Sequence, residues 1–206
     1  NIGFKLHLPI KGIMKRTMFG HFCGGETIAE STSEAQKLAE YGVESTLDYS
    51  VEGEGDEASY DHTCDEILKT IEKAENQSSL TFAVFKVTGL GDYQLMTKVQ
   101  AGETLSNDQS LAFERMKSRV DQLCHAAFQN GIKILVDAEE SWFQDVIDEL
   151  AYEAMEKYNR KTCVVYNTYQ MYRHDMLARL KAAEVVSKSK GYLLGAKLVR
   201  GPYMEK

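Results

Sequence analysis

Short apolar stretches recur along the chain, and each is followed by a segment in which apolar residues have helical spacing. The stretches are rich in Val, Leu, Ile, Phe and Tyr, and several are apolar at both odd and even positions. Such a pattern is typical of strands that are buried on both faces. The strands predicted in this way cover residues 43–50, 80–88, 132–137, 163–170 and 192–200.

Amphipathic helices are predicted between these strands. In residues 108–129, Met116, Val120 and Leu123 fall on one helical face, and Asn130-Gly131 supplies a C-cap. The helices expected cover residues 26–41, 57–76, 108–129, 143–158 and 174–190, with an extra helix and a loop in the insertion 89–107. Trp142 and Phe143 fall at a helix start, where we expect both rings to pack against the protein.

Strand and helix alternate without interruption, which indicates parallel strands joined by right-handed crossovers. An open dinucleotide-binding sheet should carry G-x-G-x-x-G after its first strand. Here Gly53 and Gly55 form G-x-G among acidic residues, and the third glycine is missing. We therefore predict an α/β fold of the (β/α)8 TIM-like barrel type, incomplete with about five βα units. Residues 1–25 are interpreted as an N-terminal lead-in, and 26–206 as one partial barrel domain with a helix ahead of its first strand.

Charge and cysteine content narrow the function. The net charge is −7, from 31 acidic and 24 basic residues, and no basic block stands out, which argues against a nucleic-acid partner. The four cysteines lie far apart and form no C-x-x-C pair, so reduced thiols are expected rather than a disulfide scaffold or a metal site. No apolar run reaches the length of a membrane span.

Polar residues stand at the ends of the predicted strands. In a barrel, alternate residues face the axis and chemistry gathers at the carboxyl ends of the strands. That register places Lys86, Asp137, Gln170 and Lys197 in one ring, to which the first strand adds Asp48. Lys86 and Asp137 lie on adjacent strands, close enough for an ion pair. Register alone leaves open whether this ring is a functional site or the solvated rim of the barrel.

Two further interpretations follow from the same residues. A lysine at a strand end beside a carboxylate, as Lys86 is, can serve as the amine nucleophile of a Schiff-base lyase or aldolase. The chain can also be a non-catalytic barrel fragment that binds a partner. A yellow, flavin-containing preparation argues against the lyase, and borohydride trapping on Lys86 supports it.

The strand ends resemble the proline dehydrogenase family. Residues 136–144 (V-D-A-E-E-S-W-F-Q) are similar to its D-A-E-x-x-x-F/Y-Q signature, and residues 166–172 (Y-N-T-Y-Q-M-Y) to its N-T-Y-Q-x-Y strand. Residues 195–203 (G-A-K-L-V-R-G-P-Y) are similar to its G-x-K-L-V-R-G-A-Y block. The resemblance also takes in residues 47–53 as the first strand and Phe85-Lys86 as the lysine motif of the second, in order from about Gly24 to Lys206.

The resemblance implies a distorted barrel that holds FAD without a covalent bond. It implies oxidation of L-proline to Δ1-pyrroline-5-carboxylate by hydride transfer to flavin N5, in proline catabolism. The electrons then pass to a membrane quinone, which implies peripheral contact with a membrane. A bacterial member would be cytoplasmic or peripheral to the inner membrane, and a eukaryotic one mitochondrial. Neither the sequence nor the resemblance indicates an oligomeric state.

Residue roles are carried over from the family by position. Lys86 would meet the proline carboxylate, and Asp137 would lie under the substrate and orient Lys86; these two are the catalytic candidates. The substrate would also be bordered by Leu198, Pro202 and Tyr203, with Glu52 in a gate over the pocket. For the cofactor, Gln170 would hydrogen-bond the flavin ring, Lys197 would lie near its reactive edge, and the backbone at Val199 and Gly201 would line it.

Two departures from the family pattern concern the substrate. Pro202 stands where the family usually has alanine. The family's Y-x-x-R-R helix, whose arginines hold the substrate carboxylate, follows the fifth strand, so the resemblance implies that this anchor comes after Lys206. We therefore expect residues 1–206 alone to be cut off before the barrel closes and to bind proline weakly.

Overall fold

The computed structural model describes residues 17, 23–25, 27–48, 55–75 and 79–201, and the chain divides into two compact units, residues 1–45 and 46–206. The first unit contains helix α4 (Ile28–Ala39). Its N-cap is Thr27, whose Oγ1 accepts a hydrogen bond from the Glu30 amide at 3.2 Å. Gly42, with φ of 74°, follows the end of the helix in the left-handed conformation that suits glycine.

The second unit is built on a sheet whose five described strands lie in chain order, β1-β2-β3-β4-β5. The register runs parallel from β2 to β5, with Phe85 opposite Val136, Val136 opposite Asn167, and Gln170 opposite Val199. Five parallel strands of this kind form half of a barrel. Their bounds are β1 (Ser45–Asp48), β2 (Leu80–Phe85), β3 (Lys133–Val136), β4 (Val165–Gln170) and β5 (Ala196–Val199).

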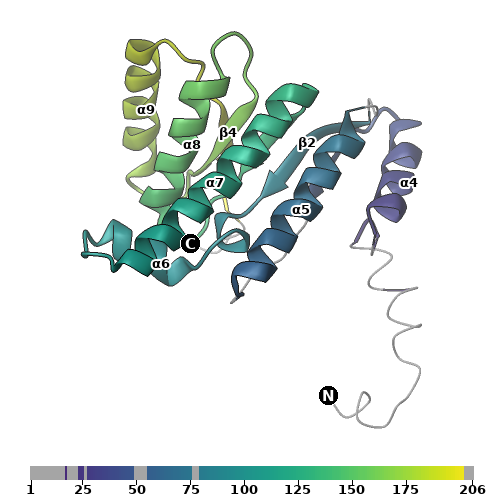
Figure 1. Cartoon of the computed structure of the whole chain (residues 1–206). Coiled ribbons are helices and arrows are strands. Elements are labelled where there is room, and N and C mark those ends of the chain that lie inside the picture. Colours follow the sequence, from purple (N-terminus) through teal and green to yellow (C-terminus); the bar gives the residue numbers. More distant parts are fainter. Residues whose placement is uncertain (1–16, 18–22, 26, 49–54, 76–78, 202–206) are drawn as a thin grey trace. The chain divides into compact units, whose positions relative to one another are not determined.

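Helices connect successive strands and lie side by side along the sheet (Figure 1). Their ends follow capping rules: α7 begins with a capping box between Ser106 and Gln109, and Gly131 ends it at φ of 67°. Gly191 ends α9 in the same conformation. The bounds are α5 (Glu57–Ala74), the 3-10 turn η2 (Val87–Gly89), α6 (Tyr93–Gln100), α7 (Asn107–Asn130), α8 (Gln144–Tyr158) and α9 (Met176–Lys190).

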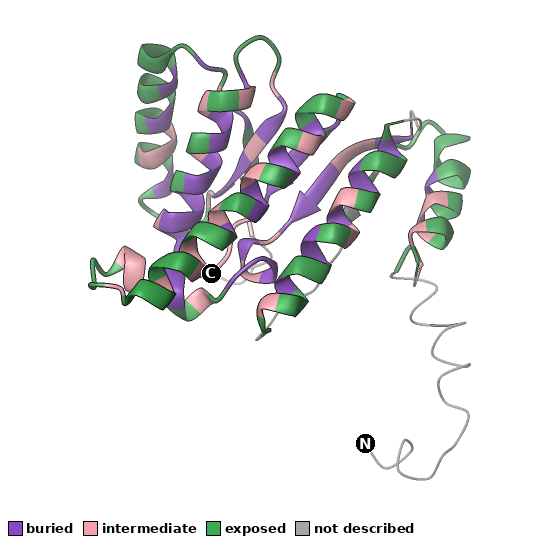
Figure 2. Ribbon diagram, viewed as in Figure 1, coloured by how far each residue is buried: buried purple, intermediate pink, exposed green. Residues whose placement is uncertain are grey.

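The core lies between the helices and one face of the sheet, and Figure 2 shows the helices buried on that side and exposed on the other. Strand residues of one parity fill it. Those at most 1% exposed are Ala83, Phe85, Ile134, Val136, Val165, Asn167 and Tyr169. The opposite parity forms the face predicted to turn toward the barrel axis. There Phe82 meets Tyr166 edge-on at 5.4 Å between ring centroids, and both residues are only half-buried.

Strand order and the extra helix in the insertion were predicted correctly, whereas two strand limits were wrong by more than two residues. Strand β2 ends at Phe85 rather than at residue 88, because the chain turns into η2. Strand β5 begins at Ala196 rather than at residue 192, because the Tyr192 amide bonds to Ser187 and the Leu193 amide to Asn159. Gly195 then packs against β4, where a Cβ atom would lie 2.2 Å from the Val165 carbonyl oxygen.

Buried polar side chains join the elements of the second unit. Arg119 of α7 is 5% exposed and binds Asp61 at 2.8 Å, Glu57 at 2.5 Å and the Leu90 carbonyl at 2.9 Å, linking α7 to α5 and to the loop after η2. The cysteines among the described residues are free, as expected, and Cys64 and Cys124 are buried. Among the described helices, none is long and apolar enough to cross a membrane.

Candidate active site at the carboxyl ends of the strands

Asp137 follows β3 and is held by two neighbouring strands. Its amide donates to the Phe85 carbonyl at 2.9 Å, so the backbone is still tied to β2. Its Oδ1 accepts a 2.8 Å bond from Lys197 Nζ on β5, in a pair whose side chains are 23% and 33% exposed. Thr168 of β4 lies between them, with its hydroxyl 3.3 Å from the same oxygen and 2.8 Å from the Val136 carbonyl. The arrangement fixes the carboxylate on the axis-facing side of the sheet.

The partner of Asp137 differs from the one expected. The strand register allowed an ion pair with Lys86 on the adjacent strand β2, whereas among the described residues Asp137 forms its ion pair with Lys197, two strands away. Lys197 is in register with Thr168, whose small side chain lets the longer lysine extend across β4. Lys86 lies instead near Glu139, where its charge acts on that carboxylate.

Glu139 connects the segments that follow β2 and β3. Its carboxylate accepts a 3.1 Å bond from the Thr88 amide and a second, short bond from the Thr88 hydroxyl. Its own amide donates to Gln144 Oε1 at 2.7 Å. Burial raises the pKa of Glu139, and the Thr88 hydrogen bonds and the charge of Lys86 oppose that rise. The result is a partly buried carboxylate beside the lysine that the sequence singled out.

An open pocket of about 580 Å³ lies above these strand ends. Gln170 forms part of its wall and donates through Nε2 to the Glu139 carbonyl at 2.8 Å. That bond orients the amide and leaves its oxygen as the acceptor that Gln170 can offer to a ligand. The residues that line the pocket are Lys86, Thr88, Tyr93, Ala138, Glu139, Glu140, Trp142, Phe143, Gln170 and Tyr172.

Aromatic rings form much of the pocket wall. Trp142 is 54% exposed and Tyr172 is 42% exposed. Phe143 is buried, with its ring centroid 6.1 Å from those of both Tyr93 and Trp142. Phe143 therefore packs as expected, and Trp142 packs edge-on against it while its exposed ring also lines the pocket. Gly201, with φ of 80°, lies against Tyr172, and a Cβ atom there would be 2.6 Å from the ring.

The remaining expected site residues differ in where the structure places them. Val199 is in register with Gln170 and shares its face of the sheet. Leu198 is in register with Tyr169, on the other parity, and is 59% exposed, so the strand does not turn it toward Lys197 and Gln170. Asp48 is the last residue of β1. Glu52, Pro202 and Tyr203 lie outside the described residues.

Sequence reasoning left most of the residues that line this pocket out of its site candidates, among them Thr88, Glu139 and Trp142. Thr88 carried a signal only under the predicted limits of the second strand, residues 80–88, because in the structure it lies in η2, where strand alternation does not apply. Glu139 and Gln144 both stand at defined positions of the D-A-E-x-x-x-F/Y-Q motif, which could have pointed to them, whereas Trp142 falls at one of its variable positions.

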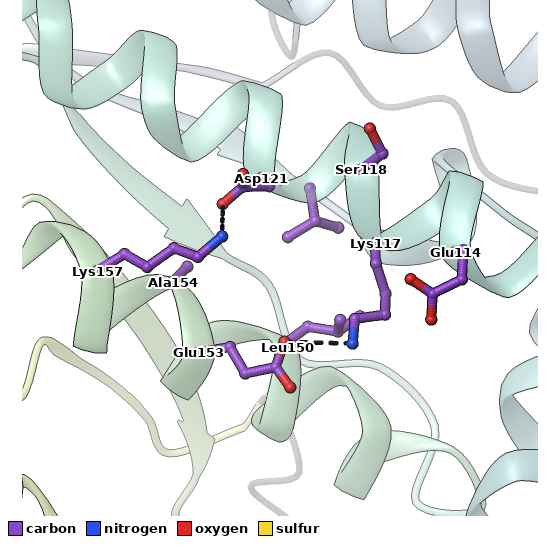
Figure 3. Close-up of a pocket in the computed structure, with 9 residues that line it drawn as sticks. Glu114, Lys117, Ser118, Asp121, Leu150, Glu153, Ala154 and Lys157 are labelled. Atoms are coloured by element: carbon purple, nitrogen blue, oxygen red, sulfur yellow. Dashed lines mark hydrogen bonds and ion pairs between the residues drawn. The ribbon is translucent and has the colours of Figure 1, made fainter.

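A second hollow, of about 220 Å³, lies between α7 and α8 and carries different chemistry (Figure 3). Ion pairs line its rim, one between Lys157 and Asp121 at 2.8 Å and one between Lys117 and Glu153 at 3.6 Å. These residues belong to the helices and not to the strand ends. Paired surface charges of this kind fit helix packing better than ligand binding.

Comparison with known proteins agrees with the fold and the strand-end motifs. The sequence model of the family described as proline dehydrogenase matches residues 31–206. The carbapenem antibiotics biosynthesis protein CarD of Pectobacterium carotovorum is 34% identical over 184 residues, which are 89% of this chain and 49% of the relative. The mitochondrial proline dehydrogenase 1 of Dictyostelium discoideum is 31% identical over 241 residues, covering 97% of this chain and 42% of the relative.

Two solved structures show the same fold at low sequence identity. Proline utilization A from Bdellovibrio bacteriovorus, inactivated by N-propargylglycine, superposes with a TM-score of 0.75 at 16% identity, covering 94% of this chain and 21% of that one. A mutant of proline utilization A from Bradyrhizobium japonicum superposes with a TM-score of 0.66 at 16% identity, covering 87% of this chain and 18% of that one. The chain thus spans half or less of the length of the proteins it matches. Because the family model covers most of its residues, the chain belongs to the proline dehydrogenase family.

Proposed function

We propose that the full-length protein is a proline dehydrogenase that oxidises L-proline to Δ1-pyrroline-5-carboxylate with FAD as its cofactor. The observation that carries the proposal is the aromatic, amide-bearing pocket at the strand ends, which adjoins Lys86 and Glu139 and lies in a chain of this family. When bound, FAD would accept one hydride, which carries both electrons of the oxidation, chemistry that side chains lack. A quinone as the next acceptor, and peripheral contact with a membrane, belong to the same proposal.

The residues present suit a flavin. An isoalloxazine is a planar aromatic ring with an amide edge, and the pocket offers exposed rings from Trp142 and Tyr172 together with the orientated amide of Gln170. We assign Gln170, Lys197, Val199 and Gly201 to holding it. Lys197 is suited to stabilise negative charge on the reduced ring, since Asp137 restrains its ammonium group at 2.8 Å.

Substrate binding is assigned to the lysine end of the pocket. Proline carries a carboxylate, and Lys86 at the end of β2 is the cation in the pocket wall that can meet it. A charge-assisted hydrogen bond of this kind contributes roughly 1.5–3 kcal/mol. Asp137 restrains Lys197 and fixes the polar floor beside the pocket. We keep Leu198, Pro202, Tyr203 and Glu52 as proposed substrate neighbours and gate on the strength of the family motif.

The rival reaction is Schiff-base chemistry at Lys86. Lys86 lies close enough to Glu139 for its positive charge to stabilise that carboxylate. A lysine beside a carboxylate suits either reaction. The aromatic, amide-bearing wall of the pocket, which a flavin ring needs and Schiff-base chemistry does not, favours the dehydrogenase over the lyase.

The test is an absorbance scan of the purified full-length protein. We expect flavin bands that bleach when L-proline is added, and a raised KM for proline in Lys86→Met with flavin content unchanged. Because one relative belongs to carbapenem biosynthesis, hydroxyproline and D-proline should be compared with L-proline as substrates. A protein that takes up no flavin, or that is trapped on Lys86 by borohydride in the presence of substrate, would contradict the proposal.

A further inference from the structure

The side-chain amide of Gln100, the last residue of α6, binds two points of the chain that follows β3. Its Nε2 donates to the Ser141 carbonyl at 3.0 Å, and its Oε1 accepts from the Asp145 amide at 2.8 Å. Ser141 precedes Trp142, and Asp145 lies in the first turn of α8. One side chain from the insertion after β2 therefore fastens both ends of the short segment that carries Trp142 and Phe143.

The second of these bonds replaces a missing helix cap. The N-cap position of α8 is Phe143, whose side chain can accept no hydrogen bond from the first turn. The first amides of a helix lack partners within the helix and need an acceptor from elsewhere. Gln100 provides that acceptor for Asp145 from another element. The start of α8 thus depends on α6 for its capping.

The fastened segment is also a wall of the pocket. Ala138, Glu139, Glu140, Trp142 and Phe143 all line it. Helix α6 contributes a second contact here, because the Tyr93 ring lies 6.1 Å from that of Phe143. The Trp142 ring is much more exposed than that of Phe143, against which it packs, so the hydrogen bonds on either side of Trp142 add to the restraint on its backbone.

We propose that Gln100 is a positioning residue that holds Trp142 in place and so sets the affinity of the pocket for a planar aromatic cofactor. The cofactor part of this inference rests on the proposed function, whereas the restraint on Trp142 does not. The residue acts through Ser141 and Asp145 and does not itself line the pocket. It follows that its loss weakens cofactor binding more than it slows turnover once the cofactor is bound.

Trp142 supplies a direct readout because it is the one tryptophan in the sequence. Acrylamide quenching and time-resolved anisotropy are measured on flavin-free 206-residue chain, with Trp142→Phe used to assign the signal. We expect Gln100→Met, which keeps the length of the side chain but neither hydrogen bond, to raise both quenching and local ring motion. Gln100→Glu keeps the acceptor for Asp145 and should give an intermediate result. Gln94→Ala, at an exposed position of the same helix, is the matched control.

Cofactor binding is measured by titrating FAD into the full-length protein. Loss of the two hydrogen bonds is expected to raise the FAD dissociation constant about tenfold in Gln100→Met. The value of kcat at saturating FAD should change less than threefold, an order-of-magnitude limit for a residue that acts through binding. Gln100→Glu, which retains the helix cap, preserves the test if Gln100→Met does not fold.

Each outcome bears on one part of the inference. Unchanged Trp142 motion in both Gln100 variants, or an equal change in Gln94→Ala, would overturn the positioning role. Increased Trp142 motion without any change in FAD affinity would overturn its link to the cofactor. Increased Trp142 motion in a protein that takes up no flavin at all would support the restraint on the ring while showing that the proposed function is wrong.

Discussion

Lys197 of β5 reaches across β4 to Asp137 after β3, with 2.8 Å between Nζ and Oδ1. Neighbouring strands lie about 4.8 Å apart, so the pair spans roughly 10 Å of sheet, which needs a long side chain passing over a short one. Thr168 is that short residue, and its hydroxyl also lies 3.3 Å from Asp137 Oδ1. The pair connects three strand ends and places a restrained ammonium group on the axis-facing side.

The first prediction concerns the coupling of these two residues. Asp137→Asn and Lys197→Met should each destabilise the fold by about 0.5–1.5 kcal/mol, because the pair is only partly buried. The double variant should lose less stability than the sum of the two single losses. The difference, measured by urea unfolding, is a coupling energy of about 0.5–2 kcal/mol. A second cycle of Asp137→Asn with Lys86→Met should show a smaller coupling. Equal couplings in the two cycles would mean that the carboxylate is shared between the lysines.

The sequence predicted part of this arrangement but not the partner of Asp137. Strand alternation was enough to place Lys86, Asp137, Gln170 and Lys197 at the carboxyl ends of parallel strands. It could not choose the partner of Asp137, because that choice depends on Thr168 being small enough for Lys197 to cross β4. Side-chain length and the size of the intervening residue enter only once the register is known in three dimensions.

The same limit applies to contacts between distant segments. The C-cap of α7 was predicted, because Gly131 follows directly at the end of the helical pattern. The cap of α8 was not, because Gln100 comes from 45 residues away. The pocket wall around Trp142 is therefore a product of tertiary structure, whereas the strand ends that it adjoins follow from local pattern.

The second prediction concerns acid sensitivity at Glu57. Hydrogen bonds from Arg115, and then from Arg119, hold the pKa of Glu57 at about 2, below its ordinary value of 4.5. A lowered pKa in the folded state stabilises the protein above pH 4.5, and this stabilisation is lost as the pH falls toward 2. Because the carboxylate is 44% exposed, we expect Glu57→Gln to cost under about 1 kcal/mol at pH 7.

The measurement is urea unfolding of wild type and Glu57→Gln at pH 7, 4 and 3. The difference in unfolding free energy between the two proteins should narrow as the pH falls from 4.5 toward 2. Glu184→Gln, which breaks an exposed pair with Lys188 within α9, is the control and should change stability less at pH 7. A gap that stays constant over this range would show that the arginines do not act on Glu57.

The third prediction concerns Glu139, whose pKa is shifted in the opposite direction to that of Glu57. Burial raises the pKa of this carboxyl in the folded protein, so the folded state holds the proton more tightly than the unfolded state does. Stability should then fall as the pH rises above the ordinary pKa of 4.5. Glu139→Gln keeps an acceptor for Thr88 and removes the charge, so it should lack this decline. Parallel pH profiles of unfolding for the two proteins would show that Glu139 is not desolvated.

The last prediction concerns Asn159, which closes α8 and is fully buried. Its Oδ1 accepts from the amides of Val164 and Val165, each at 2.9 Å. Its Nδ2 donates to the carbonyls of Val165 at 2.7 Å and Leu193 at 3.0 Å. One amide therefore satisfies backbone groups at the start of β4 and ahead of β5, at the end of the sheet opposite the pocket.

Truncating this side chain leaves those backbone groups without partners in a dry environment, at a cost of about 1–3 kcal/mol for each group that water cannot reach. We expect Asn159→Ala to destabilise the fold by about 2–4 kcal/mol, since some of the groups will find new partners. Asn159→Asp keeps the acceptor and loses the donors, and it buries a charge, so it should be no better tolerated. Asn130→Ala, which removes a single bond to the Ala126 carbonyl near the end of α7, is the control and should cost under about 1 kcal/mol. Urea unfolding at pH 7 gives the stability of all three variants. Comparable losses of stability in Asn159→Ala and Asn130→Ala would mean that water replaces the Asn159 amide and that this side chain does not close this end of the sheet.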